Sequence, residues 1–234
     1  IMDRNREFSL MDVNSKYDKY SGLAPPVSVA AFTGGINVPS ARFRVRQYKE
    51  LLNSYGISLT EFAAPLGQYP PKNRSIRPLW ATATLASRLP GILTSHQYDI
   101  TLLQREMLST FVTLEPLTKR PRILDVDDAI WLHRDGRFIE KIARSCQAVI
   151  CGNSFLAKQF SHWNKNVTIV PTGIDTNHFV PGSSTEGLII GWSGTSSGFN
   201  YLYEIEPALH SVLQKIPGAK LRIVSNEPPN FVKI

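Results

Sequence analysis

The sequence has few of the features that mark secreted, membrane-spanning or zinc-binding proteins. Its only two cysteines, Cys146 and Cys151, have no His or Cys neighbours at zinc spacing, so both are expected to pack in a core. No apolar run approaches the roughly 20 residues that span a bilayer. Residues 1–20 also lack the apolar segment of a signal peptide. These absences predict a cytoplasmic protein.

Several catalytic signatures are missing as well. The glycine turn GGINVPS at residues 34–40 has no third glycine, so the full G-x-G-x-x-G of dinucleotide enzymes is absent. Neither a G-x-S-x-G elbow nor a G-x-x-x-x-G-K-[ST] loop occurs, which argues against serine hydrolases and P-loop enzymes. The five histidines are scattered and form no pair at metal spacing. No metal site and no bound cofactor is therefore predicted.

The chain is basic, with a formal net charge of +7, but it lacks a run of Lys and Arg of the nucleic-acid-binding type. Dispersed basic residues are typical of a solvated surface. The functional alternative is weak attraction of the protein to an anionic membrane surface, which would place it peripherally on the inner face of the membrane. Nucleic acid is not an expected partner.

Apolar runs alternate with helical patterns along the chain. The runs are continuous, as in a parallel sheet that is covered on both faces, and the alternation predicts a doubly wound, mostly parallel, Rossmann-like α/β fold. The expected strands of the first domain are residues 27–33, 57–63, 98–104, 122–126, 148–151 and 167–170. The expected helices are residues 40–55, 79–89, 106–117, 136–145 and 154–163.

The composition changes after residue 172, where a Pro-Thr-Gly turn leads into a polar stretch and then a new apolar run. This pattern predicts a flexible leader at 1–26, a first Rossmann-like domain at 27–172 and a linker at 173–186. Residues 187–234 contain strands at 188–192 and 220–225 around a helix at 200–216. We expect this segment to be the first βαβ unit of a second, incomplete Rossmann-like domain.

Candidate site residues follow the predicted strands, because ligands of open α/β sheets bind beyond the carboxyl ends of strands. The glycine pair allows close approach of the backbone to an anion, although an ordinary tight turn explains it equally well. Arginines in the first turn of the next helix suit phosphate or carboxylate, or form a solvated face. The candidates are Gly34, Gly35, Arg42, Arg44, Arg105, Asp127, Asp128, Ser193, Gly194 and Thr195.

Asp127 and Asp128 are the sharpest of these features. Two carboxylates at the end of a buried strand repel each other and have perturbed pKa values, so they suit the role of base or orienting group. A helix cap or a loop pair is the alternative explanation. Asp125 and Asp127 also spell D-x-D, a metal-binding pattern, but Asp125 is expected inside the strand on the same side as Asp127.

At this point the chain resembles the family-four glycosyltransferases (glycosyl transferases group 1) of the GT-B fold. The resemblance extends from residue 27 to about residue 227, and the linker phrase is its most specific part. The segments that carry it are VSVAAFTGG (27–35), ILDVDDAIW (123–131), AVICGNSFLAKQF (148–160), VTIVPTGIDTNHFVP (167–181) and IIGWSGTSSGFNYL (189–202).

The resemblance implies retaining transfer of a sugar from a nucleotide sugar, without an essential metal, to a sugar, lipid-linked or small-molecule acceptor. It implies that Gly34 and Gly35 approach the donor phosphates, and that Ser193, Gly194 and Thr195 form the turn on the diphosphate side. Asp127 stands where the family commonly has a histidine, and Asp128 is its catalytic neighbour. Arg42, Arg44 and Arg105 are the candidates for acceptor binding.

The chain also departs from the family pattern. No Arg or Lys occurs between Gly191 and Leu202, where the family often has both, and the Glu-x7-Glu motif would lie beyond Ile234. We therefore expect this chain to be inactive alone. The alternative hypothesis is a non-catalytic Rossmann-like nucleotide-binding module or a degenerate transferase.

Overall fold

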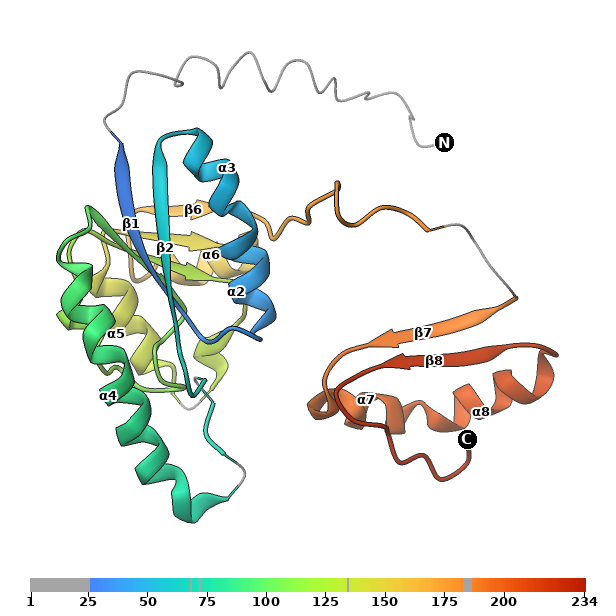
Figure 1. Ribbon diagram of the computed structural model, residues 1–234. Coiled ribbons are helices and arrows are strands. Elements are labelled where there is room, and N and C mark those ends of the chain that lie inside the picture. Colours follow the sequence, from blue (N-terminus) through green and yellow to red (C-terminus); the bar gives the residue numbers. More distant parts are fainter. Residues whose placement is uncertain (1–25, 68, 72, 134, 183–186) are drawn as a thin grey trace. The chain divides into compact units, whose positions relative to one another are not determined.

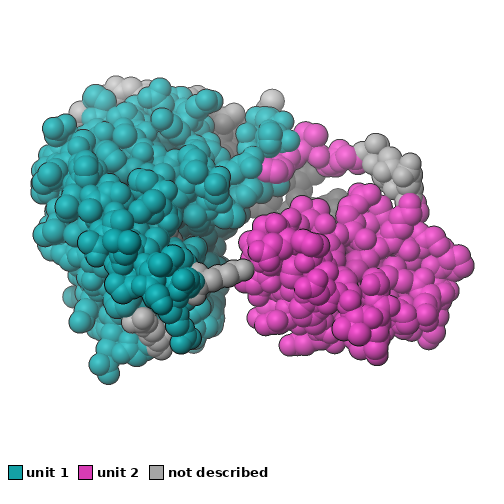
Figure 2. Space-filling model, turned by 60° about the horizontal axis from the view of Figure 1, so that its bottom comes forward, with its two compact units in different colours: residues 1–178 teal, residues 179–234 magenta. Residues whose placement is uncertain are grey.

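The structure is a computed structural model that describes residues 26–67, 69–71, 73–133, 135–182 and 187–234. The predicted leader, apart from residue 26, and residues 183–186 of the predicted linker lie outside these ranges. The chain divides into two compact units, residues 1–178 and 179–234, coloured separately in Figure 2. The division falls inside the segment that the sequence predicts as a linker, and each unit is described by itself.

Unit 1 contains a six-stranded sheet with the strand order β2-β1-β3-β4-β5-β6, in which every neighbouring pair is parallel. The continuous apolar runs of the sequence form these strands because both faces of the sheet are covered. The strands are β1 (Val27–Thr33), β2 (Ile57–Ala63), β3 (Ile100–Gln104), β4 (Arg122–Val126), β5 (Ala148–Cys151) and β6 (Val167–Ile169).

Helices lie on both sides of this sheet (Figure 1). Two short helices, α2 (Pro39–Arg44) and α3 (Lys49–Ser54), cover one side. The other side carries α4 (Arg77–Ser95), α5 (Arg137–Ser145) and α6 (Ser154–Phe160). The prediction of a doubly wound, mostly parallel α/β fold is therefore confirmed. None of the described helices combines the length and apolarity needed to cross a membrane.

The strand register sorts the core into two layers. Alternate strand residues on the α4 side belong to the larger apolar cluster, which includes Phe32, Leu103, Leu124, Val149 and Cys151. Residues of the opposite side form a smaller cluster beneath α2 and α3, made of Ala31, Val45 and Leu59 with Leu52 and Leu102 packed against it. Both cysteines are buried and free, as expected of core residues.

The helix predicted at residues 106–117 is wrong. Arg105 and Thr110 have φ values of 65° and 64°, which are incompatible with a continuous right-handed helix. The buried Glu115 carboxylate instead accepts hydrogen bonds from the backbone N–H groups of Met107 (2.7 Å) and Thr113 (2.6 Å). The Glu115 side chain thus takes the Thr113 N–H, which a helix would have bonded to the carbonyl four residues earlier, and only a 3-10 turn forms at Glu115–Leu117.

Other predicted helices have different bounds. The segment predicted as one helix at 40–55 is split into α2, a 3-10 turn at Arg46–Tyr48 and α3. Pro39 occupies the first turn of α2, and no Ser40 cap is present. In contrast, α4 continues through Pro90 to Ser95, well past the predicted end at 89.

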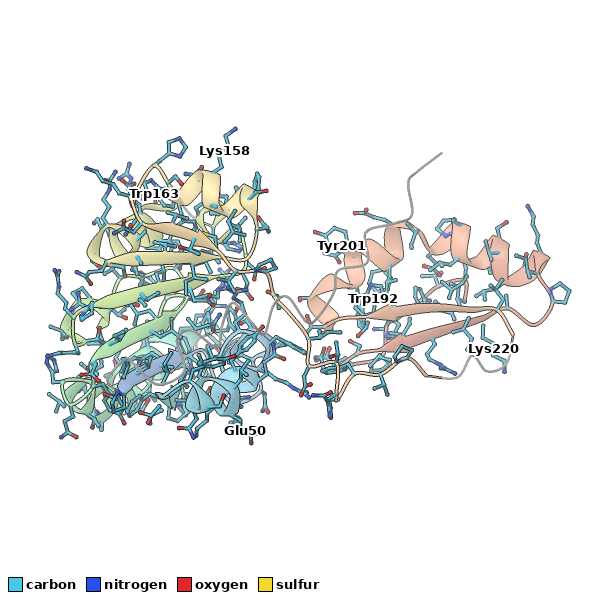
Figure 3. All side chains as sticks on the ribbon, turned by 90° about the horizontal axis from the view of Figure 1, so that it is seen from above. Glu50, Lys158, Trp163, Trp192, Tyr201 and Lys220 are labelled. Carbon is cyan, nitrogen blue, oxygen red and sulfur yellow. The ribbon has the colours of Figure 1, made fainter. Side chains whose placement is uncertain are left out.

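Unit 2 contains a parallel pair of strands, β7 (Ile189–Ser193) and β8 (Lys220–Val224), joined by α7 (Phe199–Glu204) and α8 (Glu206–Lys215). The helix predicted at 200–216 is broken at Ile205, just before Pro207. Trp192 points from β7 toward α7, where its ring centroid is 5.5 Å from that of Phe199, whereas Tyr201 points away from the sheet (Figure 3). This is the βαβ unit that the sequence predicts.

Candidate functional site

The carboxyl ends of the strands meet at one edge of the unit 1 sheet, here called the carboxyl edge. It begins where β1, β3, β4 and β5 end, and the next residues along the chain are Gly34, Arg105, Asp127 and Gly152. Because every strand pair is parallel, these residues lie on the same side of the molecule, as the ligand rule for open sheets requires.

The Gly34–Gly35 turn leaves β1 at this edge. Both glycines are buried, and Gly35 has φ +147°, a conformation that side chains of L-residues rarely adopt. The Gly35 carbonyl accepts a hydrogen bond from Val38 N–H at 3.2 Å, which directs the chain into α2. The backbone conformation at residue 35 therefore favours glycine, and this residue packs against Ala64, Val38 and Gly67.

Arg105 connects the end of β3 to the end of β4. Its Nη1 donates to Asp128 Oδ2 at 3.0 Å and to the Tyr69 hydroxyl at 3.3 Å. Its Nε lies 3.9 Å from Glu106 Oε2, and its side chain is almost fully buried. The positive φ of Arg105 directs the chain away from the strand at this position. The arginine predicted to bind an acceptor is thus engaged with the aspartate pair.

Asp127 and Asp128 differ in their surroundings. The Asp128 side chain is 65% exposed and pairs with Arg105. Asp127 is partly buried, and its Oδ1 is a buried atom with no hydrogen-bond partner among the described residues. Burial raises the pKa of Asp127, the charges of Asp128 and Asp125 add to the rise, and Arg105 opposes it. Of the two carboxyl groups, Asp127 is the one held in a perturbed state.

The hydrogen bonds of Arg44 are made within the protein. It forms a bidentate ion pair with Asp125, with contacts of 2.6 Å and 2.8 Å, and the two side chains are 3% and 4% exposed. Its Nη1 also donates to Val170 O (2.9 Å) and Thr172 Oγ1 (3.0 Å), just after β6. Arg44 was predicted to bind an acceptor, but its donors hold the segment after β6 close to β4. Asp125 lies inside the strand, as expected.

Arg42 lines a hollow of about 480 Å³ beside the glycine turn. Its guanidinium carbon lies 5.5 Å from the Phe43 ring centroid. Arg46, on the next turn of the chain, borders the same hollow and donates to both oxygens of Glu61 at 2.7 Å. The hollow therefore has one arginine held by a carboxylate and a second stacked near an aromatic ring.

Most of the buried polar side-chain atoms without a partner among the described residues gather near the carboxyl edge. Those elsewhere are Thr84 Oγ1 on α4, Thr101 Oγ1 and Arg122 Nη1. Those at the strand ends belong to Arg88, which contacts the last carbonyl of β1, and to Gln104, Arg105, Glu106 and Asp127. Native proteins leave few such atoms unpaired, and a cluster of them is typical of a binding site.

Arg88 was missed by the sequence reasoning. It lies on the buried face of α4 with Thr84 and Ile92, at a spacing of four residues, and is only 4% exposed. Its Nη2 donates to Thr33 O, the last carbonyl of β1, at 2.9 Å. The spacing from Ile92 is the signal that could have located it, but the predicted helix ended before that residue.

In unit 2, Ser193 ends β7 and Gly194 and Thr195 follow it at the carboxyl end of that sheet. Gly194 N–H donates to Val224 O at 3.1 Å, and the hydroxyls of Thr195 and Ser197 are 2.7 Å apart. A Cβ atom at Gly194 would lie 2.7 Å from the Trp192 ring, so a side chain there would force the ring to move. These residues form a polar turn like that after β1.

Within the described ranges, no group of three or more His, Cys, Asp or Glu side chains could hold a metal ion. Asp125 of the D-x-D pattern is paired with Arg44.

The fold and the site define the class as an α/β protein with a Rossmann-like parallel sheet and a polar carboxyl edge. The sequence matches no protein-family model and no curated protein. Among solved structures, the chain is similar to the crystal structure of Anabaena Alr3699/HepE in complex with UDP, with a TM-score of 0.45 and 14% sequence identity. The similarity covers 85% of this chain but 61% of that one, and a similarity of this size transfers no function.

Proposed function

We propose that this chain belongs to a retaining glycosyltransferase that moves a sugar from a nucleotide sugar to an acceptor. The observation that carries the proposal is the carboxyl edge of unit 1, where the Gly34–Gly35 turn follows β1 and Asp127 follows β4 of one parallel sheet, and where Asp127 Oδ1 has no hydrogen-bond partner among the described residues. The sequence resemblance, strongest at residues 167–181, supports the same reaction class.

In this proposal the glycine turn approaches the donor phosphates with backbone N–H groups, which are the natural partners of an anion where no side chain intervenes. Ser193, Gly194 and Thr195 supply hydroxyls and amides to the diphosphate from unit 2. No metal is required, so chelation with EDTA should leave the transfer rate unchanged.

Asp127 is the proposed catalytic carboxyl. Its unpartnered Oδ1 and raised pKa fit a group that hydrogen-bonds a sugar hydroxyl or moves a proton during transfer. The Asp128 carboxylate adds to the rise in the pKa of Asp127, and the buried Arg105 guanidinium, which pairs with Asp128, opposes it.

The hollow lined by Arg42 and Arg46 is the proposed acceptor site. Guanidinium groups suit an anionic or hydroxyl-rich acceptor, whether a sugar, a lipid-linked sugar or a small molecule. A cytoplasmic protein with weak peripheral contact to an anionic membrane remains part of the proposal, supported by the net charge of +7.

The test compares the Asp127→Asn and Asp128→Asn variants of the full-length protein. Each variant is assayed for sugar transfer with a panel of nucleotide sugars and acceptors. Asp127→Asn should lower the transfer rate by about 100-fold or more, while nucleotide affinity measured by calorimetry stays within about threefold of the parent. Equal transfer by Asp127→Asn and the parent would remove Asp127 from the mechanism. Failure of every nucleotide sugar to bind would refute the proposed function.

A non-catalytic nucleotide-binding module is the second candidate. The turn after β7 favours it, because the segment between Gly191 and Leu202 offers hydroxyls and amides but no Arg or Lys to the diphosphate. Nucleotide binding without sugar transfer or donor hydrolysis in the natural polypeptide would select this candidate.

A further inference from the structure

The buried guanidinium of Arg88 has no role in the proposed chemistry, yet it lies directly behind the glycine turn. Its Nη2 donates to Thr33 O at 2.9 Å. Its Nε and Nη1 are buried and have no hydrogen-bond partner among the described residues. A guanidinium with most of its donors unused is unusual in a protein interior, because desolvation of the charge is costly.

The charge of Arg88 is weakly compensated. Glu115 is the carboxylate whose charge acts on it, but the Glu115 oxygens accept hydrogen bonds from Met107 and Thr113 N–H groups. Burial lowers the pKa of Arg88 to about 10 despite the opposing effect of Glu115. The side chain therefore remains protonated at neutral pH, and the carboxyl edge keeps a buried positive charge.

The contact to Thr33 O has a consequence for the next residue. The carbonyl of Thr33 and the N–H of Gly34 belong to one peptide group. A charged donor on the carbonyl polarises that peptide and makes the N–H on its other side a stronger hydrogen-bond donor. In the low dielectric of the interior, the guanidinium also adds positive potential at the turn without touching a ligand there.

We infer that Arg88 is a positioning residue that makes the Gly34–Gly35 turn selective for a phosphate-class anion, acting through the Thr33–Gly34 peptide. The inference rests on the proposed function in one respect, since it takes the phosphates of a nucleoside diphosphate as the anion. It assigns the discrimination between charged and neutral ligands to a side chain that lies behind the turn.

The chain offers a matched control in Thr84. This residue precedes Arg88 by one turn on the same buried face of α4, about 6 Å along the helix axis, and its hydroxyl is also buried without a described partner. Figure 1 shows α4 as one continuous helix beside the sheet, so both variants change the same packing layer. Thr84→Val removes a polar atom and no charge.

The experiment titrates the 234-residue chain with inorganic pyrophosphate, a nucleoside diphosphate and the corresponding nucleoside at millimolar concentrations. Amide shifts of ¹⁵N-glycine report contact at Gly34 and Gly35, and circular dichroism during heating reports folding. Arg88→Met should weaken pyrophosphate and nucleoside diphosphate binding about tenfold, equivalent to about 1.4 kcal/mol, and leave nucleoside affinity unchanged. Arg88→Lys should stay within about threefold of the parent, and Thr84→Val within about twofold.

Equal pyrophosphate affinity in the parent and Arg88→Met, or no pyrophosphate binding by the parent, would overturn the inference. An equal loss of nucleoside and diphosphate affinity would also overturn it, because it would indicate a merely structural role. If Arg88→Met does not fold, Arg88→Gln takes its place as the uncharged variant, and it should show the same selective loss of diphosphate affinity. Arg88-dependent binding of pyrophosphate without any nucleotide binding would refute the proposed function alone, and nucleotide binding that ignores Arg88 would refute the inference alone.

Discussion

At the amino edge of the six-stranded sheet, where the strands begin, several polar side chains are paired with the backbone, and the buried atoms without a partner among the described residues are Thr101 Oγ1 and Arg122 Nη1. Asp99 Oδ2 accepts hydrogen bonds from both the N–H and the hydroxyl of Ser28, at 2.8 Å and 2.7 Å. Asn164 Nδ2 donates to Ala143 O and Cys146 O at the end of α5, at 2.9 Å and 2.8 Å. These contacts close helix ends and loops, and they hold the fold together.

The carboxyl edge of the same sheet is different. Arg88, Gln104 and Asp127 keep buried polar atoms that have no partner among the described residues, and Arg105 adopts a positive φ. Both edges belong to one core, so insufficient packing does not explain the contrast. In the proposed function, the carboxyl edge gives up some stability in order to bind a ligand.

The largest effect should come from a paired group at the carboxyl edge. Arg44→Met leaves the Asp125 carboxylate buried without its partner and also releases Val170 and Thr172. The free energy of unfolding should fall by about 3–5 kcal/mol, measured by urea denaturation.

The control for this pair is the exposed Arg144–Glu140 pair on α5, where Arg144→Met should cost less than about 0.5 kcal/mol. The double variant with Arg44→Met and Asp125→Leu should recover most of the loss, because no buried charge remains. A loss below about 1 kcal/mol in Arg44→Met would contradict the structural role.

The next effect tests the amino edge. Asn164→Ala removes both hydrogen bonds that close the end of α5 and should lower the free energy of unfolding by about 1–2 kcal/mol. The comparison variant is Lys165→Ala, at the exposed neighbouring residue. Its free energy of unfolding should equal that of the parent. If Asn164→Ala also had the free energy of unfolding of the parent, the Asn164 hydrogen bonds at the amino edge would not stabilise the fold.

A smaller effect, of opposite sign, is expected at Asp127. Its raised pKa means that the folded state binds the proton more tightly than the unfolded state, so this stability is present at low pH and lost as pH rises through the folded pKa. Asp127→Asn should therefore raise the thermal midpoint at pH 7 by about 2–4 °C. The gain should disappear below about pH 4, the ordinary range of aspartate.

Asp128→Asn is the matched variant, since the exposed Asp128 pairs with Arg105, and it should not raise the midpoint. The expectation is contradicted if the thermal midpoint of Asp127→Asn at pH 7 is equal to or below that of the parent. The Asp127 carboxylate would then not destabilise the folded protein.

The smallest effect concerns the cysteines, which belong to the core shared by both edges. Burial raises the pKa of both Cys146 and Cys151 to about 11, so both thiols stay protonated at pH 8. A colorimetric disulfide reagent should label neither thiol in the folded chain and both after denaturation in guanidinium. Rapid labelling of the native protein would show that the core opens readily.

Much of the fold was predictable because buried parallel strands are continuous apolar runs. The strands at 27–33, 57–63, 122–126 and 148–151 have the predicted bounds, since nothing but the core determines them. The absence of a helix at 106–117 was not predictable, because the Glu115 carboxylate takes up the backbone N–H of Met107, eight residues away, and that of Thr113, two residues away. Helix propensity does not reveal where a side chain competes with a helix for backbone N–H groups.

The candidate site was predictable in part for a similar reason. Strand ends on a parallel sheet share one edge, so Gly34 and Asp127 could be placed together from sequence order alone. The roles of the arginines could not, since each depends on a partner far away in the chain. Arg44 pairs with Asp125 across 81 residues, and Arg88 reaches Thr33 across 55.

The sequence by itself determined which residues are apolar, where strands alternate with helices, and which polar residues follow the strand ends. Those properties depend on local composition and on the period of the backbone. Only the tertiary structure decided which of those polar groups are satisfied by the protein and which stay unpaired. Pairing requires two side chains to meet in space within about 3 Å, and that distance is set by the packing of the whole sheet and its helices.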